Sequence, residues 1–290
     1  MQWRGRRESD NVDDLRGQRI SRGGAVGIGG TGLVIIVVFA LLTGQNPLDL
    51  LGQIASQQDT TTTSDGGGQP YQESANDKEQ RAFVSVVLAD TEDVWHSVFR
   101  DQLGRDYQEP RLVLFSGAID SGCGFAQAAV GPFYCPVDHK VYIDLEFYDE
   151  LQRRFGAPGD FAQAYVIAHE VGHHVQNLLG ISAKVQDAQR RAGRDVANQL
   201  SVRLELQADC FAGVWANQTE RQKKVLESGD VEEAIGAASA VGDDRIQKQT
   251  QGYVVPESFT HGSAAQRSSW FRKGFTSGKV DACDTFAGGA

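Results

Sequence analysis

The stretch Tyr165–Gly180, YVIAHEVGHHVQNLLG, carries the strongest structural signal in this sequence of 290 residues. Its apolar residues recur at the three- and four-residue spacing of a helix. Between Phe161 and Val175, the only charged residue is Glu170. The sequence therefore predicts a buried helix over 160–179, whose polar side chains need partners.

His169, Glu170 and His173 form the pattern H-E-x-x-H within this helix. Residues four positions apart share one helical face, so both imidazoles can bind one Zn²⁺ ion, with Glu170 placed as the general base for an attacking water. The ligand type favours zinc but also suits other transition metals. The alternative is a pair of core histidines satisfied by hydrogen bonds. His174 lies about 100° further around the helix, and we expect it to pack against other residues.

A catalytic zinc site needs a third protein ligand and an open coordination position. Glu205 and Asp209 lie four residues apart in the mostly apolar run RLELQADCFAGVWA (203–216). We predict Glu205 as the third ligand and Asp209 as the acceptor for the N–H of a ligand histidine. The alternative is an ordinary salt bridge to one of the nearby basic residues Arg203, Lys223 and Lys224.

The sequence resembles, in four runs, a bacterial family of neutral zinc metallopeptidases of the gluzincin type, in which H-E-x-x-H precedes E-x-x-x-D. These runs are AHEVGHHVQNLLG, ELQADCFAGVWA, THGSAAQRSSWFRKGF and CGFAQAAVGPFYCPVDHKVYIDLEFYDEL. The resemblance covers about Ala75 to the C-terminus. It implies a zincin-like domain with one Zn²⁺ ion on His169, His173 and Glu205 and with Glu170 as catalytic base. Family members also have a short cytoplasmic tail, one membrane anchor and a polar linker.

His261 and Arg267 belong to the third of these runs. An imidazole near the metal could stabilise the oxyanion of a tetrahedral intermediate, which makes His261 a second catalytic candidate. Arg267 is expected to neutralise Asp209 or to bind a substrate carboxylate. The structural alternatives are a capping histidine and a surface arginine. His96 and His139 are interpreted as structural.

The remaining patterns indicate an α+β domain that is mostly helical, with a small antiparallel sheet. Further helices are predicted over 77–103, 145–155, 183–218 with a break near Gly193, 220–228, 230–249 and 263–275. A strand is predicted at 111–115, and a hairpin joins 132–135 to 140–145. We expect 111–116 to form the sheet edge that pairs with extended substrate, and Tyr142 to line the cleft.

The net charge of −10 is unevenly distributed. Residues 1–24 hold six arginines and four acidic residues, a net charge of +2, and are predicted to form a disordered cytoplasmic tail. Residues 23–48 carry no charge, and 25–44 is interpreted as one transmembrane helix, preceding a flexible linker at 45–74 and a domain at 75–290. A cleaved signal peptide and a buried core helix are the alternatives.

The arginines before this segment place the N-terminus in the cytoplasm and the domain in the periplasm or outside the cell. The segment also contains G-x-G-x-x-G at 27–32, but no βαβ context, so a dinucleotide site is rejected. An acidic chain without basic clusters is not expected to bind nucleic acid.

Four cysteines, at positions 123, 135, 210 and 283, are expected to form two disulfides in that oxidising compartment. Cys123 and Cys135 are close enough in sequence to pair, which would leave Cys210 with Cys283. Four cysteines nevertheless permit three pairings, and the sequence alone does not choose. A site of four zinc-bound thiolates is disfavoured because C-x-x-C does not occur.

Together these patterns predict a membrane-anchored zinc metallopeptidase, a hydrolase that cleaves peptide bonds outside the cytoplasm. The expected partners are a peptide or protein substrate and the lipid bilayer, and the oligomeric state is not predicted. One rival is a zinc-stabilised scaffold or chaperone that binds peptides, which a metal contact from His174 or Asp209 would favour. Another is an enzyme that hydrolyses a non-peptide amide, such as cell-wall material.

Overall fold

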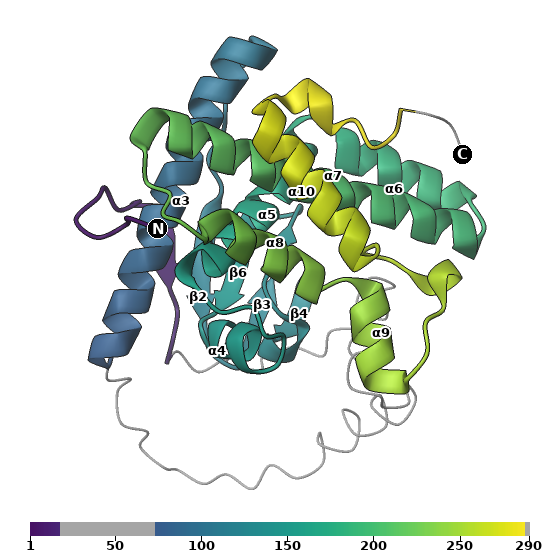
Figure 1. Cartoon of the computed structure of the whole chain (residues 1–290), viewed down its shortest axis with the longest axis horizontal. Helices are drawn as coiled ribbons and strands as arrows, with labels where there is room; N and C mark the ends of the chain where they lie inside the picture. The colour runs from purple at the N-terminus through teal and green to yellow at the C-terminus, as the bar shows by residue number, and fades with distance from the viewer. Residues whose placement is uncertain (18–72, 288–290) are drawn as a thin grey trace, which may run out of the picture.

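The structure is a computed structural model that describes residues 1–17 and 73–287. It is a mostly helical α+β fold with a small sheet, as predicted (Figure 1). Helix α5 (Asp160–Leu178) runs through its centre and contacts the helices α3 (Ala75–Val98), α7 (Arg194–Lys223) and α8 (Asp230–Ala240) and the strands β5 and β6. The helix predicted over 160–179 is therefore confirmed, and its motif lies in the core.

The main sheet has the strand order β1-β2-β6-β5. Its strands are β1 (Val12–Asp14), β2 (Arg111–Phe115), β6 (Lys140–Asp144) and β5 (Phe133–Cys135). β5 and β6 form the predicted hairpin, whereas β2 pairs in parallel with both β1 and β6. The prediction of an antiparallel sheet is wrong, because parallel partners joined by long connections leave no local signature. β2 lies inside the sheet, so the prediction of an edge at 111–116 is wrong as well.

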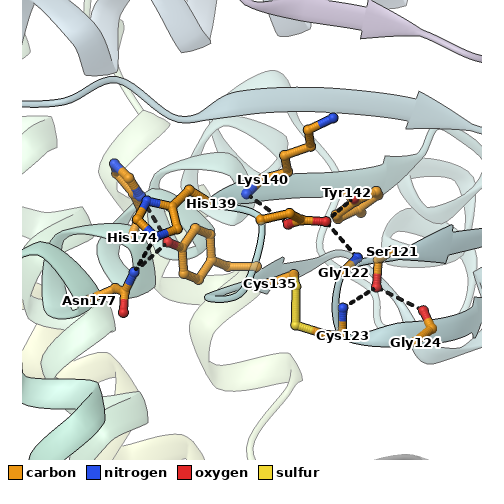
Figure 2. The surroundings of a disulfide bond; sticks show 12 residues. Ser121, Gly122, Cys123, Gly124, Cys135, His139, Lys140, Tyr142, His174 and Asn177 are labelled. Atoms are coloured by element: carbon orange, nitrogen blue, oxygen red, sulfur yellow. Dashed lines mark hydrogen bonds between the residues drawn. A yellow bond between two sulfur atoms is a disulfide. The ribbon is translucent and has the colours of Figure 1, made fainter.

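A separate two-stranded sheet was not predicted. Its strands are β3 (Ala118–Ser121) and β4 (Gly124–Gln127). The Cys123–Cys135 disulfide joins the turn of this sheet to β5 (Figure 2). The Asp138 carboxylate accepts hydrogen bonds of 2.6 Å from the Gly122 N–H and from the Tyr142 hydroxyl. Tyr142 therefore fastens the two sheets together through Asp138.

The other helices are α4 (Glu146–Arg153), α6 (Ile181–Arg191), α9 (Asp243–Gln251) and α10 (Ala264–Ser277). The break predicted near Gly193 is confirmed between α6 and α7. The helix predicted at 220–228 is wrong, because α7 ends at Lys223 and Lys224 adopts φ +51°. The helix predicted at 230–249 is interrupted at Gly242, where an added Cβ would lie 2.3 Å from the Ala264 nitrogen.

Helices α7 and α10 pack at very close range. A Cβ added to Gly213 would lie 2.1 Å from the Phe271 carbonyl oxygen, and one added to Gly274 would lie 1.9 Å from the Cys210 carbonyl oxygen. The Cys210–Cys283 disulfide joins α7 to a 3₁₀ turn, Val280–Cys283, that follows α10. The two disulfides thus have the pairing that was expected, and the second one fixes the C-terminal turn on α7.

Residues 1–17 fold onto the domain, next to α3 (Figure 1). Met1 and Arg16 are 5% and 7% exposed, and the Met1 α-ammonium lies 2.6 Å from the Asp160 carboxylate. The prediction of a disordered tail is wrong for these residues. Their strand pairs with the otherwise open edge of β2 and their arginines meet domain carboxylates, which composition alone cannot show.

The predicted anchor at 25–44 and nearly all of the linker at 45–74 lie outside the described residues. Among residues 1–17 and 73–287, no helix is both long enough and apolar enough to cross a membrane.

Candidate metal centre

Helices α5 and α7 bring three donor side chains together. The ligand atoms of His169, His173 and Glu205 all lie within 4.8 Å of one another. Glu205 Oε2 lies 3.2 Å from His169 Nε2, and Glu205 Oε1 lies 3.4 Å from His173 Nε2. Ligand atoms at about 2.0–2.1 Å from a tetrahedral ion are about 3.3 Å apart, so this spacing fits one zinc ion.

Gly172 allows the two helices to approach at the level of these donors. A Cβ at this position would lie 3.0 Å from the Ala208 carbonyl oxygen and 3.2 Å from the Ala208 Cα. Gly172 lies next to His173, and Ala208 lies next to Asp209. The glycine inside the motif therefore sets the distance between the histidines on α5 and the carboxylates on α7.

Each histidine of the triad has its second ring nitrogen hydrogen bonded. Asp209 Oδ1 lies 2.9 Å from His169 Nδ1, and Gln176 Oε1 lies 2.9 Å from His173 Nδ1. Both oxygens accept, so both imidazoles carry a proton on Nδ1, and Nε2, the nitrogen on the Glu205 side, is the atom left to bind a metal. The structure thus places Asp209 where the sequence analysis expected it, and adds Gln176 in the equivalent role.

Asp209 is fully buried and bound by Arg267. The guanidinium donates from Nε to Oδ2 at 2.8 Å and from Nη2 to Oδ1 at 2.9 Å, and the Tyr165 hydroxyl also donates to this carboxylate. Burial opposes the charge of Asp209, but Arg267 and His169 outweigh it and lower the pKa of this carboxyl. Arg267 is 3% exposed, so it is not a surface arginine.

The sequence left open a salt bridge from Glu205 or Asp209 to Lys223. This salt bridge is not formed, because Lys223 pairs instead with two acidic residues on α3, Asp90 and Asp93.

Glu170 is buried beside the triad, with 8% exposure. Burial raises the pKa of its carboxyl, against the opposing effect of His173 and His169. A carboxylate whose pKa is raised is a better proton acceptor near neutral pH than an exposed one. Glu170 is therefore a buried carboxyl with a raised pKa, next in sequence to His169.

His261 reaches the same site from the loop before α10. Its Nδ1 lies 3.2 Å from Asp243 Oδ1, while Asp243 Oδ2 accepts from the backbone N–H groups of Thr260, His261 and Gly262 at 2.8, 2.6 and 2.9 Å. Burial lowers the pKa of His261, but the Asp243 hydrogen bond and the charge of Glu205 raise it overall. Asp243 therefore holds both the imidazole and the main chain of His261, and the charge of Glu205 acts on that imidazole.

The family described as "Putative neutral zinc metallopeptidase" matches residues 1–286. The chain belongs to this family. It is 50% identical over 298 residues to the "Uncharacterized protein YpfJ" of Escherichia coli (strain K12), with 99% of each chain covered. It is 43% identical over 260 residues to the "Uncharacterized protein Rv2575" of Mycobacterium tuberculosis (strain ATCC 25618 / H37Rv), covering 86% of this chain and 85% of that protein. No solved structure matches.

In this member of the family, His174 is hydrogen bonded to residues outside the triad. It is fully buried, its Nε2–H donates to the Gln108 carbonyl at 2.7 Å, and its Nδ1 accepts from the Tyr134 hydroxyl at 3.0 Å. Burial lowers the pKa of His174 to about 4, so it stays neutral. Figure 2 shows His174 and His139 beside Asn177, near the hairpin that carries Cys135. The expectation that His174 packs is consistent with these contacts.

Three residues of the candidate site were not identified from the sequence: Gln176, Tyr165 and Asp243. Gln176 follows His173 by three positions and Tyr165 precedes His169 by four, so helical spacing placed both on the motif face and could have found them. Asp243 precedes His261 by 18 positions and lies at the start of a different helix. No local pattern links Asp243 to the site.

Proposed function

We propose that the protein is a zinc-dependent peptidase that holds one Zn²⁺ ion on His169, His173 and Glu205. The observation that carries this proposal is the convergence of two Nε2 atoms and one carboxylate at the spacing of a tetrahedral site, with both Nδ1 atoms already bound. Membership of the zinc metallopeptidase family supports the choice of metal and of reaction class.

Zinc in this position would supply the Lewis acidity that polarises a scissile carbonyl and lowers the pKa of water. Glu170 accepts the proton of the attacking water and transfers it to the leaving amine. His261, held by Asp243, donates a hydrogen bond to the developing oxyanion. Arg267 keeps Asp209 charged, and Asp209 keeps His169 oriented with its Nε2 towards the metal.

The substrate-binding edge is reassigned from 111–116 to β5. Within the described sheet, β5 is an outer strand, and it contacts the motif helix α5. An extended peptide can pair with an open strand edge through main-chain hydrogen bonds. We therefore propose that substrate lies along Phe133–Cys135, beside the metal centre.

A catalytic site is favoured over a purely structural zinc site. His174 and Asp209, whose contact with the metal would favour a scaffold, are both engaged by other partners. The side chains of His169, His173 and Glu205 are 8, 17 and 18% exposed, so solvent reaches the donors. Three protein donors and solvent access are the properties of a catalytic zinc site.

The two disulfides support a domain outside the cytoplasm, in the periplasm or beyond, where such bonds persist. Membrane attachment through 25–44 remains a proposal from the apolar sequence of that segment.

The decisive experiment measures zinc content and hydrolysis of unfolded casein by the purified full-length protein. Glu170→Gln should retain zinc and lose hydrolysis, while Glu150→Gln, a change of an exposed residue on α4, should retain both. Unchanged hydrolysis in Glu170→Gln would refute the proposed base. Bound zinc with no hydrolysis by the native protein would favour the peptide-binding scaffold, and cleavage of peptidoglycan amides but not of casein would favour the cell-wall amidase.

A further inference from the structure

The N-terminal residues and the acidic face of α3 are complementary in charge. Three arginines of the segment 1–17 pair with carboxylates that α3 presents along its length. The pairs are Arg4 with Glu79, Arg6 with Asp90, and Arg7 with both Glu92 and Asp93. Asp90 and Glu92 are 1% and 2% exposed, so the segment 1–17 helps to cover charges that would otherwise face water.

Buried neutral contacts accompany these ion pairs. The Ser9 N–H donates to the Ser85 carbonyl at 3.0 Å, and the Ser9 hydroxyl donates to Glu92. The Trp3 ring packs edge-on against Phe83 with centroids 5.4 Å apart. The contact therefore has an interior like that of the domain core, with hydrogen bonds and aromatic packing.

The main chain of the segment completes the sheet. Val12, Asp13 and Asp14 pair in parallel with Leu112, Val113 and Leu114. Hydrogen bonds from Leu112 N to Asn11 O and from Leu15 N to Leu114 O, both 2.8 Å, extend the pairing at either end. Removing the segment would leave β2 as an unpaired edge.

The chain leaves the domain and returns to it at one point. Arg16 binds Asp14 through two hydrogen bonds, of 2.8 and 2.6 Å, and donates to Glu73 at 2.9 Å, and Arg81 donates to the same Glu73 oxygen at 3.0 Å. Gly17 and Glu73, which flank residues 18–72, are therefore held together. The apolar stretch 25–44 lies between two fixed ends on the same surface.

We propose that residues 1–17 are a permanent part of the catalytic domain and lie on the same side of the membrane as that domain. A single crossing within 18–72 would place the two on opposite sides and break every contact described above. The charge-free stretch 23–48 is long enough for one helical crossing of about 20 residues, but not for two. The stretch 25–44 can then attach the protein to a bilayer only from the domain's side.

This proposal replaces the expectation of a cytoplasmic N-terminus. That expectation rested on Arg16, Arg19 and Arg22, which precede the apolar segment, acting as free positive charges at the membrane. Of these three, Arg16 lies within the described residues, where it pairs with Asp14 and Glu73 of the folded protein. The proposal is independent of the peptidase activity, because it concerns only where two parts of the chain lie.

The first test compares two single cysteines in the full-length protein in native membranes, using a membrane-impermeant maleimide. All four native cysteines are paired, so only the new thiol reacts. Arg4→Cys reports on the segment and Val137→Cys on the domain, at side chains 75% and 70% exposed. We expect both to be labelled to the same extent in intact cells and after permeabilisation. Labelling of one only after permeabilisation would overturn the proposal.

The second test examines docking directly. Ser9→Cys with Ser85→Cys should form a disulfide on mild oxidation of the same membranes, while either single variant should not. Absence of this cross-link, with both single cysteines on the same side, would also overturn the proposal.

Reversal of the paired charges in Arg6→Glu with Arg7→Glu should lower the melting temperature by several degrees, whereas Arg100→Glu, at an exposed ion pair with Asp101, should not.

Discussion

Asp243 holds His261 by its imidazole and by its main chain: one carboxylate oxygen lies 3.2 Å from Nδ1, and the other accepts from the His261 N–H at 2.6 Å. Asp243 begins α9, whereas His261 precedes α10, so a carboxylate at a helix start fixes the loop that carries His261. The position of His261 therefore depends on a residue of a different element.

We expect His261→Ala to lower kcat by about 10²–10³-fold with little change in zinc content, because one oxyanion donor is lost. Asp243→Asn should lower kcat by less, since the loop loses its charged acceptor but keeps the imidazole. The measurements are kcat and KM on a peptide substrate, together with zinc content.

The double variant tests whether Asp243 acts by positioning His261 or has an effect of its own on kcat. If Asp243 acts through His261, then Asp243→Asn combined with His261→Ala should be no slower than His261→Ala alone. If the double variant instead loses kcat by the product of the two single-variant losses, the proposed role of Asp243 is contradicted.

Asp209→Asn should weaken zinc affinity by about 10–100-fold, because the amide is a poorer acceptor for His169 Nδ1 than the carboxylate. It should also lower the free energy of unfolding by about 3–5 kcal/mol, since Arg267 then remains buried without its countercharge. Competition with a chelating dye and urea denaturation measure the two effects.

Gln176→Ala tests the second histidine. It should weaken zinc binding by about 10-fold by releasing His173 Nδ1. Gln186→Ala, a change on the exposed face of α6, is the matched control and should alter neither zinc affinity nor stability. Equal zinc affinity in the Gln176 and Gln186 variants would show that His173 needs no hydrogen-bonded partner.

The features that could be predicted from the sequence are those that depend on residues a few positions apart in the chain. His169 and His173, like Glu205 and Asp209, are four residues apart, so one helical turn relates each pair and their faces could be inferred. The pairing of β1 with β2 joins residues 100 positions apart, and Asp243 meets His261 across two elements. Such contacts follow from how the elements pack, and neither periodicity nor composition records them. Arg4, Arg6 and Arg7 showed the same limit, because their partners lie on α3.

Gly274→Ala should destabilise the fold strongly, because its Cβ would lie 1.9 Å from the Cys210 carbonyl oxygen and would force α10 away from α7. Gly236 is the matched control, since it is also helical and has no atom within 4 Å of an added Cβ. Gly236→Ala should stabilise the protein by about 0.5–1 kcal/mol through helix propensity. Thermal denaturation measures both, and equal melting temperatures would contradict the close packing of α7 and α10.

The Cys210–Cys283 disulfide is connected to His173 through two glutamines. Gln207 donates to the Cys283 carbonyl at 3.0 Å, Gln176 donates to Gln207 at 3.2 Å, and Gln176 accepts from His173. Replacing Cys210 and Cys283 by alanine removes the constraint on the C-terminal turn and should cost about 2–5 kcal/mol of stability.

The same double replacement should also weaken zinc affinity, because the freed turn no longer fixes Gln207 and hence Gln176. The Cys123–Cys135 disulfide, which joins two strand elements, is the control, and its loss should reduce stability with a smaller effect on zinc. The measurement is the zinc affinity of the two double variants, obtained by competition with a chelating dye at a temperature where both are fully folded. An equal loss of zinc affinity in both would mean that general loosening of the domain, not the glutamine relay, links the C-terminal turn to His173.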